Sequence, residues 1–219
     1  MTHFVSVGSD RLRLLRNGEQ ALPALYAAIA AASHEIALEM YWIGADRVGK
    51  HVRDLLVERA KAGVTVRVIY DAFGSIGLSE DFFSALVDAG GAAVPFHALW
   101  PFSRTFRVGR LDQRDHRKLL VVDGKHMFLG GLNLTVQWHP LEDGGGGWRD
   151  DVIELVGPTA SEGRALFYKT WKWLTGEPPP PDVRPLRRTP GPVGLYTSQR
   201  GGKRNLRAEL LRLFSKAHN

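Results

Sequence analysis

Strand-like and helix-like segments alternate along most of the chain, and this alternation constrains the fold more than any other feature. Residues 36–43 (IALEMYWI) are typical of a largely buried strand, and residues 64–70 (VTVRVIY) alternate like a half-buried one. Between them, residues 49–62 have the period of an amphipathic helix that stops at Gly63. This order favours an α/β fold in which helices flank both faces of a mixed β-sheet.

The remaining segments extend the same pattern. The further helices that we expect are residues 21–32, residues 81–88 with Ser79 as N-cap, and residues 159–174. The further strands are residues 12–15, 92–96, 118–122, 126–129 and 152–156. Asp123-Gly124 joins two of these strands and is a strong signal for a two-residue hairpin turn.

Four prolines at residues 178–181 indicate a domain boundary, with a first lobe over residues 1–177 and a proline-rich linker over 178–192. Residues 193–219 then repeat the order with which the chain opens. A strand at 193–198, a glycine turn and a helix at 205–217 follow one another, as a strand, Asn17-Gly18 and a helix do at the start. This basic segment is either the beginning of a truncated second lobe or an unrelated C-terminal helix.

The net charge of +6 is concentrated at the C-terminal end. Residues 182–219 hold 9 Lys and Arg against 2 Asp and Glu, whereas residues 1–181 hold 20 against 21. Such a tail is commonly a solvated end, although it can also bind nucleic acid or anionic lipid. The absence of cysteine excludes disulfides and a thiol nucleophile. With no signal peptide or membrane-spanning run, we expect a cytoplasmic or peripherally membrane-associated protein.

Six residues in the middle of the chain have a spacing that suits phosphate chemistry. His116 and Lys118 are followed by Asp123, Gly130-Gly131 and Asn133, in the pattern H-x-K-x4-D-x6-G-G-x-N. Two residues apart on a strand, His116 and Lys118 project from the same face. The imidazole can attack phosphorus while the ammonium neutralises a phosphoryl oxygen, to which Asn133 can also donate a hydrogen bond. The glycine pair lets backbone and substrate approach closely.

This pattern resembles the signature of the phospholipase D superfamily without a gap. The flanking segments NGEQALPALYAAI, ALEMYWIGADRVGK, VRVIYDAFGS and WRDDVIELVGP resemble the N-terminal half of bacterial cardiolipin synthase-like proteins. The resemblance covers about residues 12–174. It implies a single phospholipase D-type lobe that transfers phosphodiesters through a phosphohistidine, without metal or other cofactor.

Three acidic positions are candidates for supporting roles. A nucleophilic imidazole needs a carboxylate on its far nitrogen. The segment WRD aligns with the family segment that supplies this group, so we assign it to Asp150, 34 residues after His116, with Asp151 as the weaker candidate. Asp123 belongs to the family's catalytic motif, although its hairpin position suggests a structural task. Glu39 matches a family position near the site, and its role stays open.

A metal site is the alternative interpretation of the same region. Asp115, His116, Asp123 and His126 lie close together in the sequence and could be taken for a ligand cluster. Lys118 lies among them, and an ammonium repels a cation. We therefore expect no metal.

Aromatic and basic residues interleave between residues 100 and 114, where they could meet a lipid interface or nucleic-acid bases. The candidates are Trp100, Phe102, Arg104, Phe106 and Arg107. A loop that packs on the edge of the domain is an equally weighted alternative.

The family's reaction uses two imidazoles, yet His116 belongs to the only H-x-K of this chain. The chain is therefore a homodimer, half of a tandem enzyme that needs a missing second lobe, or a module without activity. We expect a cardiolipin synthase-like phosphatidyltransferase that acts on an anionic phospholipid. The alternative is a homodimeric phosphodiesterase or endonuclease. Nucleic acid is the less favoured partner because residues 1–181 are not basic.

Overall fold

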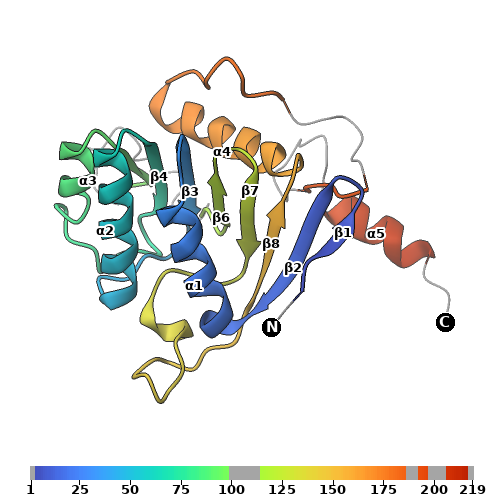
Figure 1. Ribbon diagram of the computed structural model, residues 1–219, viewed down its shortest axis with the longest axis horizontal. Coiled ribbons are helices and arrows are strands. Elements are labelled where there is room, and N and C mark those ends of the chain that lie inside the picture. Colours follow the sequence, from blue (N-terminus) through green and yellow to red (C-terminus); the bar gives the residue numbers. More distant parts are fainter. Residues whose placement is uncertain (1–2, 99–113, 186–191, 197–205, 217–219) are drawn as a thin grey trace.

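A computed structural model of the chain describes residues 3–98, 114–185, 192–196 and 206–216. The described strands form one eight-stranded sheet in the order β1-β2-β8-β7-β6-β3-β4-β5 (Figure 1). The strands are β1 (Val5–Val7), β2 (Asp10–Arg16), β3 (Glu35–Met40), β4 (Thr65–Asp71), β5 (Ala92–Phe96), β6 (Lys118–Val122), β7 (His126–Gly130) and β8 (Asp151–Val156). The helices are α1 (Asn17–Ala30), α2 (Arg47–Lys61), α3 (Ser84–Asp88), the 3-10 helix η2 (Val136–Trp138), α4 (Ala160–Thr175) and α5 (Leu206–Lys216).

The sheet is mixed, as the sequence predicts. Strands β3, β4 and β5 run parallel to one another. On the other side of β3, the strands follow in the order β6, β7, β8, β2 and β1. Each of these strands is antiparallel to the strand before it in this order. The parallel half contains the strand–helix units, and the antiparallel half contains the hairpin.

Helices cover both faces of this sheet, which confirms the expected architecture (Figure 1). Helices α1, α2 and α3 bury Leu22, Leu56 and Leu86 in one apolar cluster on the first face. Helix α4 buries Phe167 and Trp171 in a second cluster on the opposite face. Each cluster removes apolar surface from water, and this burial is the main favourable contribution to folding.

The central strand β3 is covered on both sides, which explains its continuous run of apolar residues. All six of its residues are buried. Ile36, Leu38 and Met40 belong to the first cluster, whereas Ala37 belongs to the second. Because side chains alternate along a strand, Glu39 points toward the α4 face.

The strand directions bring several polar residues to one edge of the sheet. Because β6 is antiparallel to β3, the end of β3 lies beside the beginning of β6, where Met40 pairs with Lys118. In the same way, Gly130 at the end of β7 pairs with Val152 near the beginning of β8. The parallel strand β4 ends at this edge too, with Asp71. We call this edge, where β3, β4 and β7 end and β6 and β8 begin, the site edge.

Two local expectations have different outcomes. Asp123 and Gly124 have φ angles of 52° and 63°, which are the positive values of a type I′ turn, so the predicted hairpin is confirmed. Helix α3 is shorter than residues 81–88, and the N-cap is Phe83 rather than Ser79. The residues that directly precede this helix form turns, and the aromatic side chains of Phe82 and Phe83 are buried in the first cluster.

The C-terminal segment differs in part from its prediction. Residues 193–196 form no strand, and residues 197–198 lie outside the described part of the chain. Leu195 is only 6% exposed, and its N–H donates to Glu162 Oε2 of α4 at 3.3 Å. The backbone of this segment thus bonds to a side chain, whereas a strand would bond to the backbone of a neighbouring strand.

Helix α5 has the expected position and lies away from the helices that cover the sheet (Figure 1). None of its described residues is buried, and its apolar side chains Leu210, Leu211 and Phe214 are exposed. No helix within the described ranges has both the length and the apolar character to cross a membrane.

Candidate active site

His116 and Lys118 lie on the same side of the sheet at the site edge. Lys118 begins β6, and Leu120, two residues further, belongs to the first apolar cluster. His116 directly precedes the strand and is exposed. The alternation expected from the H-x-K spacing therefore matches the observed geometry.

The Lys118 side chain is buried and directed by the backbone next to it. Lys118 is only 5% exposed, and its Nζ donates to the carbonyl oxygen of His116 at 2.9 Å. Burial lowers the pKa of Lys118 to about 8, while Asp115, Asp150 and Asp71 act in the opposite direction. The ammonium thus stays mostly charged at neutral pH, with three acids near it.

The imidazole of His116 has an environment that favours its neutral form. Burial lowers its pKa from the ordinary value of 6.5, and the charge of Lys118 lowers it further. Asp115, Asp71 and Asp150 act in the opposite direction. A neutral imidazole has a free lone pair, as a nucleophile requires.

Asn133 is held with its amide group in a defined orientation. It is 5% exposed, and its Oδ1 accepts a hydrogen bond from the backbone N–H of Trp42 at 3.1 Å. With the oxygen engaged in this way, the NH2 group is what Asn133 can offer to a phosphate. Trp42 packs against Trp138 and Trp148, with ring centroids 5.9 and 6.1 Å away, and this cluster supports the segment.

The two glycines of the motif allow close packing around the site. A Cβ atom on Gly130 would lie 2.3 Å from the carbonyl oxygen of Asp151. A Cβ atom on Gly131 would lie 2.1 Å from Oδ1 of Asp150. Both contacts are too short for any side chain, so the glycines are required for Asp150 to lie beside the motif. Within the described residues, Asp150 Oδ1 accepts from the N–H of Asp151 at 2.9 Å and makes no hydrogen bond with His116.

Glu39 lies beneath the site, on the opposite face of the sheet from Lys118. It is fully buried, and Arg117 reaches it with an N–O distance of 2.9 Å. The same guanidinium donates to Asp115 Oδ1 at 2.8 Å. Burial raises the pKa of Glu39 well above its ordinary value, and the neighbouring charge of Asp115 raises it further. Arg117, which lies between His116 and Lys118 in the sequence, therefore links Glu39 and Asp115.

Bacterial cardiolipin synthases are among the curated relatives of the chain. A family profile described as "Cardiolipin synthase, PLD-like domain" matches residues 25–139. The chain belongs to this family. "Cardiolipin synthase 2" of Bacillus anthracis is 33% identical over 165 residues, which are 75% of this chain and 32% of that protein. "Cardiolipin synthase A" of Pseudomonas aeruginosa (strain UCBPP-PA14) is 34% identical over 180 residues, 82% of this chain and 36% of that protein. The chain thus spans about a third of the length of these relatives.

Solved structures have the same fold as this PLD-like domain. Nuc from Salmonella typhimurium, titled a phospholipase D family member, matches with a TM-score of 0.53 and 16% identity over 76% of this chain and 95% of that chain. NucT from Helicobacter pylori matches with a TM-score of 0.55 and 14% identity over 74% and 96%. Since each match covers nearly all of the other chain, each of those chains is about one lobe in size.

Asp123, which the family motif groups with the catalytic residues, lies away from the site edge of this PLD-like domain. Lys118 and Asp123 stand at opposite ends of β6, about 16 Å apart at the usual rise of a strand. The carboxylate of Asp123 accepts hydrogen bonds from the N–H groups of Ser33, His34 and Glu35 at 3.0, 2.8 and 2.8 Å. These contacts fit the structural task that its position in the hairpin suggests.

The residues that could be taken for a metal cluster are also divided between the two ends of the sheet. His126 lies beyond the hairpin and contacts Glu154 Oε1 at 2.8 Å, far from His116. Among the described residues, no group of three or more His, Asp and Glu side chains could hold a metal ion.

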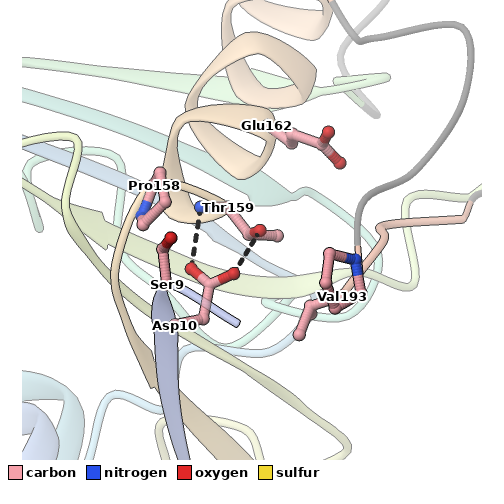
Figure 2. A pocket seen from close by; sticks show the side chains of 7 residues that line it. Ser9, Asp10, Pro158, Thr159, Glu162 and Val193 are labelled. Atoms are coloured by element: carbon pink, nitrogen blue, oxygen red, sulfur yellow. Dashed lines mark hydrogen bonds between the residues drawn. The ribbon is translucent and has the colours of Figure 1, made fainter. Parts of the chain in front are cut away.

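One cavity lined by described residues lies away from the site edge. It has a volume of about 90 Å³ and lies where β2 begins, beside the start of α4 (Figure 2). Asp10 contacts Thr159 there, with Oδ1 accepting the backbone N–H at 3.0 Å and Oδ2 the hydroxyl at 2.7 Å. This carboxylate binds the first turn of α4 and is therefore explained by the fold.

The lipid or nucleic-acid contact candidates Trp100, Phe102, Arg104, Phe106 and Arg107 lie outside the described residues. The neighbouring Arg114 is described, and its guanidinium lies 5.0 Å from the ring centroid of Phe73.

Two further residues lie next to the motif, and no sequence pattern marked them as part of the site. Tyr41 follows β3, and its ring packs against both His116 and Lys118. Asp71 ends β4 and is fully buried. The sequence does contain a signal for Asp71, namely a charged residue at the end of an apolar strand. Such a residue is rarely buried without a partner, so a polar contact could be expected there.

Proposed function

We propose that this PLD-like domain transfers phosphodiester groups of anionic phospholipids, as a cardiolipin synthase-like phosphatidyltransferase. The observation that carries the proposal is the convergence of His116, Lys118 and Asn133 at one sheet edge, with a neutral imidazole favoured beside a charged ammonium. The names of the curated relatives support the substrate class.

In the proposed first step, a ring nitrogen of His116 attacks the phosphorus of the donor lipid. A phosphorus–nitrogen bond forms, the bond from phosphorus to the leaving alcohol breaks, and that alcohol takes up a proton. In the second step an acceptor alcohol or water loses a proton and attacks phosphorus, and the phosphorus–nitrogen bond breaks. Lys118 and Asn133 stabilise the negative phosphoryl oxygens during both steps.

The proton in this scheme needs a second imidazole, which acts first as an acid and then as a base. The chain has one H-x-K, so the second motif must come from another copy of the chain or from another lobe. Support for this requirement comes from the exposure of His116, which leaves room for a facing surface.

Asp150 is proposed to orient the imidazole for attack. Its carboxylate lies against Gly131 and acts on the pKa of both His116 and Lys118. In the proposed substrate complex the carboxylate reaches the imidazole, since hydrogen bonds of free enzymes often tighten in the complex.

The test is turnover of vesicles that contain phosphatidylglycerol by the wild-type protein and by His116→Ala and Lys118→Ala. Each substitution should lower the rate by about 10³-fold or more, because it removes the nucleophile or the main charge that stabilises the transition state. Matched controls are His34→Ala and Lys125→Ala, which change exposed residues far from the site edge. After rapid quenching, mass spectrometry should find the lipid phosphoryl adduct on the peptide that contains His116. Undiminished turnover by His116→Ala would overturn the proposed function.

A further inference from the structure

The ring of Tyr41 lies beside both principal side chains of the motif. Its centroid is 4.7 Å from that of the His116 imidazole, with the planes inclined at 60°. The Nζ of Lys118 is 4.8 Å from the same centroid, a distance at which an aromatic face attracts a cation. One aromatic ring therefore contacts both the proposed nucleophile and the ammonium next to it.

The backbone of Tyr41 is held from below by the loop that follows β4. Ser75 Oγ donates to the carbonyl oxygen of Tyr41 at 3.3 Å and accepts from the N–H of Ile43 at 3.0 Å. A Cβ atom on Gly74 would lie 2.3 Å from that carbonyl oxygen and 3.0 Å from Cε2 of the Tyr41 ring. Any side chain at position 74 would therefore displace Tyr41.

Asp71 connects this loop to the chain that carries His116. Its Oδ1 accepts hydrogen bonds from the N–H groups of Phe73 and Gly74 at 2.9 and 3.1 Å. Its Oδ2 accepts from the N–H of Asp115 at 2.9 Å. One fully buried carboxylate thus anchors both the loop beneath Tyr41 and the residue before His116.

We propose that Tyr41 is a positioning residue, whose ring holds the His116 imidazole and the Lys118 ammonium in the arrangement needed for phosphoryl transfer. Asp71 sets the place of this ring relative to the histidine. The inference rests on the proposed function of His116 and Lys118. An exposed imidazole can otherwise rotate about two side-chain bonds, and loss of alignment with phosphorus slows the attack.

The first experiment compares Tyr41→Phe with Tyr41→Leu. Phenylalanine keeps the ring, so its kcat should stay close to the wild-type value. Leucine removes the ring, so its kcat should fall by about tenfold or more with little change in KM, because alignment rather than binding is lost. Gly74→Ala, which displaces the ring without changing it, should act like Tyr41→Leu. Wild-type kcat for both Tyr41→Leu and Gly74→Ala would overturn the proposal.

The second readout needs no turnover, so it separates this inference from the proposed function. The imidazole signals of His116 are assigned in carbon–proton NMR spectra by comparison with His116→Ala. They should be preserved in Tyr41→Phe and displaced in Tyr41→Leu, because the neighbouring ring current is lost. Loss of activity in His116→Ala with identical His116 signals in Tyr41→Leu would leave the proposed function intact and overturn the role of Tyr41.

Discussion

The two side chains at the centre of the site have opposite protonation requirements. His116 has to be neutral to attack phosphorus, and Lys118 has to be charged to bind a phosphoryl oxygen. Burial and the charge of Lys118 lower the pKa of His116 below 6.5. Burial lowers the pKa of Lys118 to about 8. Between the lowered pKa of His116 and the pKa of Lys118, both groups are in the form that the proposed reaction uses.

A bell-shaped dependence of kcat/KM on pH follows. The rate should rise with pH as His116 loses its proton below 6.5, and fall as Lys118 loses its proton near about 8. Initial rates measured from about pH 5 to about pH 10 would check both limbs. In Lys118→Arg the part of the alkaline limb that comes from Lys118 should disappear at a reduced rate, because a guanidinium stays charged. A wild-type rate that stays constant through the alkaline range would contradict the role of Lys118.

Substitution of Asp150 should affect both the rate and the pH profile. In Asp150→Asn we expect kcat to fall by about 10²-fold, because the imidazole loses its orienting carboxylate. The negative charge of Asp150 raises the pKa of His116, so its removal should move the acid limb to lower pH. Asp151→Asn is the matched control, since the side chain of Asp151 is exposed next to it. Equal losses in the two variants would argue against the assignment to Asp150.

At the scale of elements, the hairpin between β6 and β7 is bound to the beginning of β3 by Asp123. Besides the three hydrogen bonds to its carboxylate, the N–H of Asp123 donates to the carbonyl oxygen of Glu35 at 2.9 Å. Partial burial acts to raise the pKa of Asp123, but the hydrogen bonds from Glu35, Ser33 and His34 outweigh it, so the pKa is lowered from 3.8. The ionised carboxylate therefore stabilises the fold above the unfolded-state pKa. This contribution is lost as the pH falls through the lower, folded-state pKa.

Removal of this carboxylate should reduce stability rather than catalysis. Asp123→Ala is expected to lower the free energy of unfolding by about 2–3 kcal/mol at neutral pH, because three backbone donors lose a charged acceptor. Urea denaturation would measure the loss. Asp54→Ala, which removes an exposed acid of α2 paired with Arg53, should change stability little. If Asp123→Ala abolished turnover while unfolding at the same urea concentration, Asp123 would have to be returned to the catalytic machinery.

At the scale of the whole molecule, the domain has exposed apolar side chains at the site edge. Phe73 and Ile76 follow β4 at the site edge, and they are 54% and 71% exposed. Trp148, which precedes β8 there, is 51% exposed. The site edge thus exposes apolar side chains as well as the polar side chain of His116. Such a surface suits a second motif-bearing lobe or a lipid interface.

The choice of substrate class is tested by a side-by-side titration with anionic vesicles and with a DNA duplex at physiological salt. We expect binding to vesicles, and weaker binding when Trp100 and Phe106 are replaced by serine, because their rings would enter the interface. Light scattering of the active fraction should give at least twice the mass of a single chain, since the proposed reaction needs two motifs. Tight, salt-sensitive duplex binding without vesicle binding would favour the dimeric endonuclease instead.

The sequence by itself determined most of the elements and the residues of the motif, because both depend on neighbours in the chain. The alternation of residues 64–70 predicts β4, Asp123-Gly124 predicts the hairpin, and the two-residue spacing of His116 and Lys118 places them on one face. These features follow from backbone periodicity and turn chemistry, which act over a few residues.

Only the tertiary structure decided which distant residues meet. The contacts of Tyr41 with His116 and of Asp71 with Asp115 depend on the strand order β6-β3-β4, which no local pattern specifies. The length of β6 separates Asp123 from Lys118, although both belong to one sequence motif. The physical reason is that a strand carries its two ends to opposite edges of the sheet, whatever their closeness in sequence.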